Sequence, residues 1–125
     1  MILGLGLDVV EVARIRSLRE RSGARFLRRV FTEAEAEECL GRVDPDLHLA
    51  ARFAAKEAGM KALGTGWSQG VCWRDFQVLS GAGAPPRLEL SGRAEQRGRG
   101  MGVRRTHLSL SHDGGVAAAV VVLEA

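Results

Sequence analysis

Apolar residues recur along the chain with two kinds of spacing, one typical of helices and one typical of strands. Apolar positions three or four residues apart indicate one face of a helix, whereas continuous or alternating apolar runs indicate strands. The pattern predicts strands over residues 2–7, 73–79, 87–90, 107–111 and 116–123, and helices over 10–20, 26–30, 32–40, 47–63 and 92–99. Strands and helices are segregated, which favours an α+β domain over alternating βαβ units.

Several element boundaries carry a recognisable local signal. Thr32-Glu-Ala-Glu35 is a capping box at the start of a helix. Gly64 follows the alanine-rich helix 47–63, as is common after a helix C-terminus. Residues 81–86 form a loop, and Asp113-Gly-Gly115 predicts a hairpin turn. The final strand, 116–123, is almost continuously apolar, so we expect both of its faces to be covered by the core or by a partner subunit.

Length and composition indicate a single globular domain over residues 1–125. The 125 residues are 46% hydrophobic and 26% charged, which is enough to bury one core without disulfides or metals. Two cysteines, Cys39 and Cys72, are too few for a four-ligand zinc site. The longest apolar run is shorter than a membrane span, and Asp8 interrupts an N-terminus that has no basic leader. We therefore expect a cytoplasmic protein with free thiols and no membrane contact.

The net charge of +3 conceals a strongly uneven distribution. Seven arginines lie between Arg14 and Arg29 against the single acid Glu20, and the stretch 33–46 is acidic. Such blocks indicate either a basic face for an acidic or phosphorylated partner, or a solvated helix surface. Nucleic acid is a poor candidate partner, because the chain has no tyrosine and only two tryptophans for base stacking.

Three clusters of residues are candidates for chemistry. Asp8 follows the first strand, where it either caps the next helix or binds a divalent cation. In the stretch 52–61, which holds both lysines of the chain, Glu57 and Lys61 are four residues apart and share a helix face. They form either a solvated surface pair or, with Asp8, two carboxylates for Mg²⁺ beside an ammonium for phosphate or proton transfer.

The third cluster is Ser109-Leu-Ser111-His112-Asp113. Histidine is the natural proton carrier near neutral pH, but neighbouring residues of a strand point in different directions, which excludes a Ser-His-Asp triad. Residues 64–66, Gly-Thr-Gly, directly follow the alanine-rich helix. There the glycines permit either close approach of a ligand or a plain helix end.

Together, residues 4–15, 52–66 and 108–121 resemble the holo-[acyl-carrier-protein] synthases, the small bacterial phosphopantetheinyl transferases. The resemblance implies an α+β fold with a mostly antiparallel sheet packed with helices, associating as a homotrimer with active sites at subunit interfaces. It implies transfer of 4′-phosphopantetheine from coenzyme A to a serine of apo acyl carrier protein. Adenosine 3′,5′-bisphosphate is the other product, and Mg²⁺ is required.

The same resemblance assigns roles to individual positions. Asp8 and Glu57 would hold the metal with the pyrophosphate of coenzyme A, and Lys61 would contact phosphate oxygens or the leaving group. The general base stays open between Glu57 acting through water, Asp8, and His112 with Asp113. Coenzyme A would contact Arg52, Gly64, Thr65, Gly66, Pro86, Arg87 and His112, and the carrier would dock on Arg14, Leu18 and Arg21.

Three positions depart from the family pattern. Gly59-Met60 replaces a bulky aromatic residue followed by a small one, and Asp113 replaces a hydroxyl residue after His112. Ala84-Pro85-Pro86 lacks the usual basic residue, which removes one coenzyme A contact or moves it to Arg87. The alternatives to a transferase are a basic nucleic-acid-binding protein and a scaffold that binds the carrier without catalysis. The sequence does not choose between fatty-acid and polyketide carriers.

Overall fold

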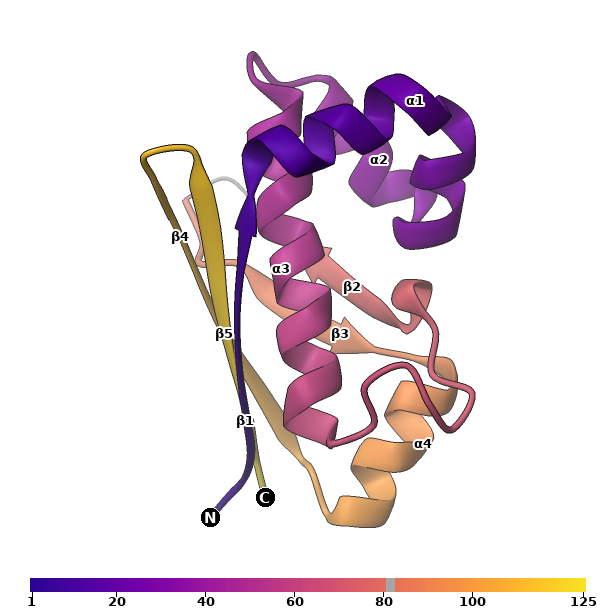
Figure 1. Ribbon diagram of the computed structural model, residues 1–125. Coiled ribbons are helices and arrows are strands. Elements are labelled where there is room, and N and C mark those ends of the chain that lie inside the picture. Colours follow the sequence, from indigo (N-terminus) through magenta and orange to yellow (C-terminus); the bar gives the residue numbers. More distant parts are fainter. Residues whose placement is uncertain (81–82) are drawn as a thin grey trace.

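The computed structural model describes residues 1–80 and 83–125, so Gly81 and Ala82 of the predicted loop lie outside the described residues. Figure 1 shows the arrangement of the elements along the chain. In order they are β1 (Ile2–Glu11), α1 (Val12–Val30), α2 (Glu33–Leu40), α3 (Pro45–Leu63), the 3₁₀ turn η1 (Trp73–Asp75), β2 (Phe76–Leu79), β3 (Arg87–Leu90), α4 (Gly92–Met101), β4 (Arg105–Asp113) and β5 (Val116–Glu124).

Helix α3 lies at the centre of the fold, between two antiparallel sheets. One sheet has the strand order β1-β5-β4 and the other pairs β2 with β3. Figure 1 shows the larger sheet on one side of α3, with β2, β3 and α4 on the other and α1 and α2 across its N-terminal end. The α+β class and the antiparallel sheet predicted from the sequence are confirmed.

Two glycines allow β1 to lie directly against α3. A Cβ atom on Gly4 would collide with the carbonyl of Ala62, and one on Gly6 would collide with the carbonyl of Ala58. Glycine inside a strand often marks such an approach. Gly59 has a similar role on another side of α3, because its Cβ would meet the ring of Phe76 at 2.7 Å. These glycines therefore serve helix packing.

The structure corrects two predictions for the N-terminal half. β1 does not end near Leu7 but continues to Glu11, because it pairs with β5 in register to Val116. Asp8 therefore lies within the strand, and it does not cap α1, whose N-cap is Glu11 without a side-chain bond. The predicted break between the helices 10–20 and 26–30 is confirmed as a kink at Gly23, with φ of 41°, although α1 runs through to Val30.

Two further predictions are corrected in the C-terminal half. The segment 73–79 begins with the turn η1 before β2. Within one chain, the core covers β5 on one face only: Ala117, Ala119, Val121 and Leu123 are buried against α3, whereas the residues between them are half-buried, so cover by a partner subunit stays a prediction. The opposite side of the sheet, which we call the outer face, consists of Leu5, Leu7 and Val9 of β1 beside Val122, Val120 and Ala118 of β5.

The outer face is apolar and open to solvent along β1. Leu5, Leu7 and Val9 are each about 60% exposed, which is unusual for a row of large apolar side chains. The two termini meet at one end of this sheet (Figure 1), where the Ala125 amide donates to the Met1 carbonyl at 2.9 Å. Within the described ranges, no helix is long and apolar enough to cross a membrane.

Candidate active site

β1 and α3 bring together three of the side chains predicted to act in catalysis. Asp8 is on the inner face of β1, where it is largely buried against α3. Glu57 and Lys61 lie one turn apart on α3, and the Lys61 Nζ is 3.1 Å from the Asp8 Oδ1. The same ammonium donates to the Leu7 carbonyl at 2.9 Å. The arrangement is thus two carboxylates with one cation, held between a strand and a helix.

Glu57 lies close enough to Asp8 for the two carboxylates to interact strongly. Burial raises the pKa of Glu57, the negative charge of Asp8 raises it further, and Arg14 and Lys61 act in the opposite direction. A divalent cation bound to both carboxylates would offset the negative charge of Asp8 that acts on Glu57. Mg²⁺ typically takes one or two protein carboxylates and completes its shell with phosphate oxygens and water.

The donor set agrees with a magnesium site that substrate completes. Among residues 1–80 and 83–125, no three side chains of His, Cys, Asp or Glu lie close enough together to hold a metal ion. Asp8 and Glu57 would therefore supply two ligands only, and a pyrophosphate would supply others. The exposed ammonium of Lys61, with 54% of its side chain accessible, is free to contact the same phosphate.

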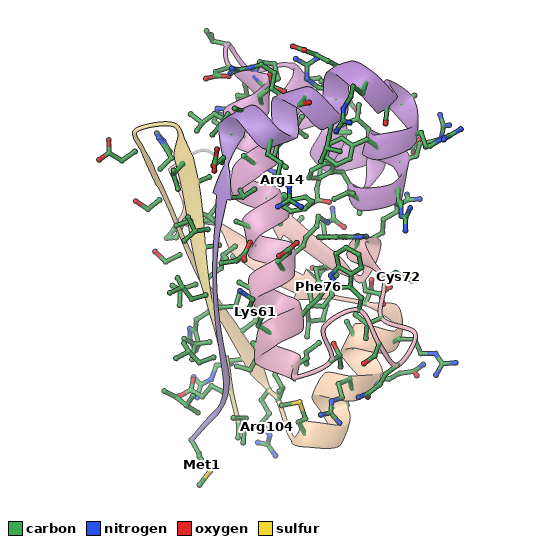
Figure 2. All side chains as sticks on the ribbon, viewed as in Figure 1. Met1, Arg14, Lys61, Cys72, Phe76 and Arg104 are labelled. Carbon is green, nitrogen blue, oxygen red and sulfur yellow. The ribbon has the colours of Figure 1, made fainter. Side chains whose placement is uncertain are left out.

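The predicted docking residues lie on α1, above this site. Arg14 and Arg21 are exposed and Leu18 is half-buried. The Arg14 guanidinium lies 5.5 Å from the ring centroid of Phe53, which precedes Glu57 by one turn of α3. Figure 2 shows Arg14 and Lys61 along the same side of α3. Arg14 also lies close enough to Glu57 for its charge to lower the pKa of that carboxyl.

Part of the arginine-rich block of α1 has a structural role that the sequence does not reveal. The Arg19 Nε donates to the Asp46 Oδ1 at 2.6 Å and the Arg16 Nε to the Oδ2 at 3.1 Å. The pKa of the Asp46 carboxyl is lowered by these hydrogen bonds, that from Arg19 first. Asp46 is buried at the start of α3. These two arginines therefore attach α1 to α3, and the other arginines of the block carry its surface charge.

Arg52 lies mostly inside the fold. Its Nη2 donates to the Ser80 Oγ at 3.0 Å and lies 3.4 Å from the Glu38 Oε2, and only 4% of the residue is exposed. Its buried Nε has no hydrogen-bond partner among the described residues. The guanidinium thus joins α3 to Glu38 of α2 and to Ser80, which follows β2. Contact with coenzyme A would have to use the N–H groups of Arg52 that these two partners leave free.

The Gly64–Gly66 turn lies at the C-terminal end of α3, next to Lys61. Gly64 has φ of 74° and caps the helix, as its sequence position predicts, and Gly66 has φ of 54°. The Thr65 hydroxyl is buried and donates to the Gly66 carbonyl at 3.1 Å. Since Lys61 is one turn before Gly64, this backbone borders the same site as the carboxylates.

His112 and Asp113 lie at the other end of α3. They line an open pocket of about 330 Å³ with Asp44 and the start of α1. His112 of β4 pairs with Ala117 of β5, and Asp8 of β1 pairs with Ala119 of β5. The strand β5 therefore lies between His112 and Asp8, and their positions along it differ by two residues. Because His112 and Asp113 are consecutive in β4, their side chains leave opposite faces of the strand. Within one chain, His112 is thus separated from Asp8 by the width of β5.

The remaining predicted contacts to coenzyme A precede and begin β3. Pro86 is half-buried and Arg87 is exposed. Arg87 pairs with Leu79 across the small sheet. The predicted residues thus form three groups along α3: one around Asp8, Glu57 and Lys61 with the glycine turn, one around Arg52 and the start of β3, and one at His112.

Comparison with known proteins gives a single consistent family. Residues 4–120 match the model of the 4′-phosphopantetheinyl transferase superfamily. The chain is 57% identical to the holo-[acyl-carrier-protein] synthase of Anaeromyxobacter dehalogenans, with 99% of this chain and 97% of that protein aligned. It is 49% identical to the synthase of Koribacter versatilis over 99% of each chain.

Solved structures agree with this result. The holo-[acyl-carrier-protein] synthase of Neisseria meningitidis superposes with a TM-score of 0.90 at 34% identity, covering 100% of both chains. The Helicobacter pylori synthase in complex with coenzyme A gives a TM-score of 0.84 at 30% identity, covering 96% of this chain and 99% of that one.

Proposed function

The chain belongs to the holo-[acyl-carrier-protein] synthases of the 4′-phosphopantetheinyl transferase superfamily, and from that premise we propose how this phosphopantetheinyl transferase works. It transfers phosphopantetheine from coenzyme A to acyl carrier protein. The finer proposal is a Mg²⁺-dependent attack by a carrier serine, with adenosine 3′,5′-bisphosphate as the other product. The pairing of Asp8 with Glu57 beside the accessible Lys61 carries this proposal.

The reaction exchanges one phosphorus–oxygen bond for another. The serine oxygen bonds to the phosphorus that carries pantetheine, the bond to the bridging pyrophosphate oxygen breaks, and the electron pair leaves on adenosine 3′,5′-bisphosphate. The serine proton passes to a base. Such transfers depend mainly on positioning and charge neutralisation. When bound to Asp8 and Glu57, Mg²⁺ supplies that neutralisation to the pyrophosphate.

The side chains around the site divide the remaining work. Lys61 donates to phosphate oxygens, because an ammonium has three donors and only two partners hold it here. The backbone of Gly64–Gly66 borders the phosphate position. The base that takes the serine proton stays open between Glu57 acting through water, Asp8, and His112 with Asp113. His112 of the same chain lies two strands away from Asp8.

We propose that three copies assemble through the outer face. Leu5, Leu7 and Val9 form an exposed apolar row that association would cover. The separation of His112 from Asp8 across the sheet supports the same assembly, because a neighbouring copy would bring a second group of coenzyme A contacts to the site. The proposal places the enzyme in the cytoplasm, in keeping with two cysteines that are both free.

An intact-mass assay tests the function. The protein is mixed with apo acyl carrier protein, coenzyme A and Mg²⁺, and a parallel sample contains a chelator. We expect the carrier to gain one phosphopantetheine group only with metal, together with an equal amount of adenosine 3′,5′-bisphosphate. The control is a second synthase that modifies the same carrier preparation. If that control succeeds and this protein leaves the mass of the carrier unchanged, the proposed transfer is contradicted. A gain that persists in chelator contradicts the metal requirement alone.

A further inference from the structure

Three aromatic side chains lead from the interior of the fold to its surface beside the active site. We call Phe53, Trp73 and Trp67 the aromatic row. The rings of Phe53 and Trp73 stack with centroids 4.7 Å apart, and Trp67 meets Trp73 edge-on at 5.2 Å. Phe53 is buried, Trp73 is half-buried and Trp67 is 66% exposed. The exposed indole of Trp67 therefore packs against Trp73, which in turn packs against Phe53, and these contacts restrict its motion.

The aromatic row starts at the catalytic side of α3. Phe53, Glu57 and Lys61 are spaced four residues apart along one ridge of this helix, a distance of about 12 Å from first to last. Arg14 of α1 covers the Phe53 ring at 5.5 Å. Trp67 follows Gly66 in the loop after α3. The row thus connects the proposed docking helix with the turn that borders the phosphate position.

Positive charge lies around the exposed end of the row. Beyond Trp67, Gln69 and Gly70 line an open hollow of about 480 Å³ together with Arg93, Gln96 and Arg97 of α4. No acidic side chain lines this hollow among the described residues. Trp67 is thus linked through Trp73 and Phe53 to Arg14 of α1, and the loop residues that follow it face Arg93 and Arg97 of α4. An apolar centre with a cationic rim fits an acidic partner that presents an apolar side chain.

We propose that Trp67 is the apolar anchor of the carrier-docking surface. On the premise of the proposed function, acyl carrier protein covers this indole while its serine occupies the site of Asp8, Glu57 and Lys61. Tryptophan and arginine are the residues most often found as binding hot spots, and a ring already held in place loses little freedom when covered. The loop lies on the side of α3 away from the larger sheet (Figure 1), so Trp67 is not part of the outer face.

Fluorescence can observe Trp67 directly. Trp67 and Trp73 are the only tryptophans and the chain has no tyrosine, so Trp73→Phe leaves Trp67 as the one indole and keeps a ring against Phe53. We expect a tryptophan-free apo carrier to shift the emission of Trp67 to shorter wavelength, and coenzyme A with Mg²⁺ to leave it unchanged. Unchanged emission at saturating carrier overturns the proposal. A shift with coenzyme A alone also overturns it, since it would place the pantetheine arm on this indole.

Steady-state kinetics gives an independent test. We expect Trp67→Ala to raise the KM for the carrier about tenfold and leave the KM for coenzyme A unchanged, and Trp67→Phe to recover most of the loss. Val43→Ala is the matched control, because Val43 is fully exposed in the turn between α2 and α3. An unchanged carrier KM in Trp67→Ala, or an equal rise of both KM values, overturns the anchor. Failure of the unmodified enzyme to transfer at all would instead overturn the proposed function.

Discussion

Lys56 and Lys61 are the only lysines of the chain, and they meet opposite environments on the same helix. Lys56 is fully buried, and its Nζ lies 2.7 Å from the Glu35 Oε1 and donates to the carbonyls of Trp73 and Phe76. Lys61 is more than half exposed and, within residues 1–80 and 83–125, bonds only to Asp8 and the Leu7 carbonyl. Five positions on a helix rotate a side chain by about 140°, so one ammonium enters the core and the other leaves it.

The contrast shows which charges of the conspicuous stretch 52–61 are free to act. All three donors of Lys56 are engaged by groups of the fold, so it has nothing left for a ligand. Burial lowers the pKa of Lys56, and the neighbouring Glu35 opposes that effect. Lys61 keeps a donor and lies beside two carboxylates. We infer that Lys56 holds α2, α3 and β2 together while Lys61 takes part in the reaction.

The largest effect is expected from the acids beside Lys61. Glu57→Gln removes one carboxylate of the proposed metal pair, and we expect turnover to fall by roughly a thousandfold or more with the fold intact. Asp8→Ala should behave in the same way. The rate of holo-carrier formation measured by intact mass checks both variants. Near-normal turnover in either one removes that residue from the metal site.

The same Glu57→Gln variant has an expected effect on stability with a defined sign. The folded-state pKa of Glu57 is raised, so this group favours folding below its ordinary pKa, and that contribution is lost as pH rises through the raised value. At neutral pH the ionised side chain opposes folding, and Glu57→Gln should raise Tm there but not under acid conditions. A Tm lowered at neutral pH contradicts this assignment.

The next largest effect is expected at Lys56. Lys56→Met leaves Glu35 as an unpaired buried charge, which typically costs about 3–5 kcal/mol of unfolding free energy. Urea denaturation measures the loss. The double variant Lys56→Met with Glu35→Gln should recover part of it, since the buried charge is gone and the single amide oxygen can still accept from one of the two backbone amides, of Val78 or Thr32, that donate to Glu35. A loss below about 1 kcal/mol in Lys56→Met would contradict a structural role.

Lys61→Met should show the reverse pattern. Because the ammonium is exposed, its pairing with Asp8 contributes less than about 1 kcal/mol to stability. Loss of a donor to the reacting phosphate should lower turnover by about a hundredfold. Turnover and urea denaturation, measured on the same preparations as for Lys56→Met, provide the comparison. A Lys61→Met variant that unfolds easily but turns over normally would reverse the two roles.

Local signals predicted much of the fold, because short-range contacts fix those features. The capping box at Thr32 and Glu35 forms as expected, Gly64 ends α3, and the turn after Asp113 joins β4 to β5. The end of β1 was mispredicted because it depends on pairing between Glu11 and Val116, more than a hundred residues apart. Periodicity likewise does not show that the apolar strand β5 has a partly open face, since that depends on which elements pack against it.

In the candidate site, too, the sequence predicted the residue types but not the contacts that depend on the tertiary fold. Asp8, Glu57 and Lys61 were identified from their residue types and the family resemblance, and the structure gathers them. The partner of Lys56, Glu35, lies 21 residues away in another helix, and no spacing rule connects them. The same holds for Arg52 with Glu38. Burial separates structural from functional charges here, and burial is a property of the tertiary fold.

The smallest expected effect is on the rate at which the two cysteines react with a thiol reagent. Like the two lysines, one cysteine is buried and the other is exposed. Cys39 is buried, and burial raises the pKa of its thiol to about 11, whereas Cys72 is exposed. Because the thiolate is the reactive form, a thiol reagent near neutral pH should label Cys72 alone in the folded protein.

Cys39 lies close enough to Glu35 for the charge of Glu35 to affect the pKa of the Cys39 thiol. Lys56→Met should therefore accelerate labelling of Cys39 by opening this region more often, and Lys61→Met should not. Equal acceleration in both variants would mean that the two lysines support the same part of the fold.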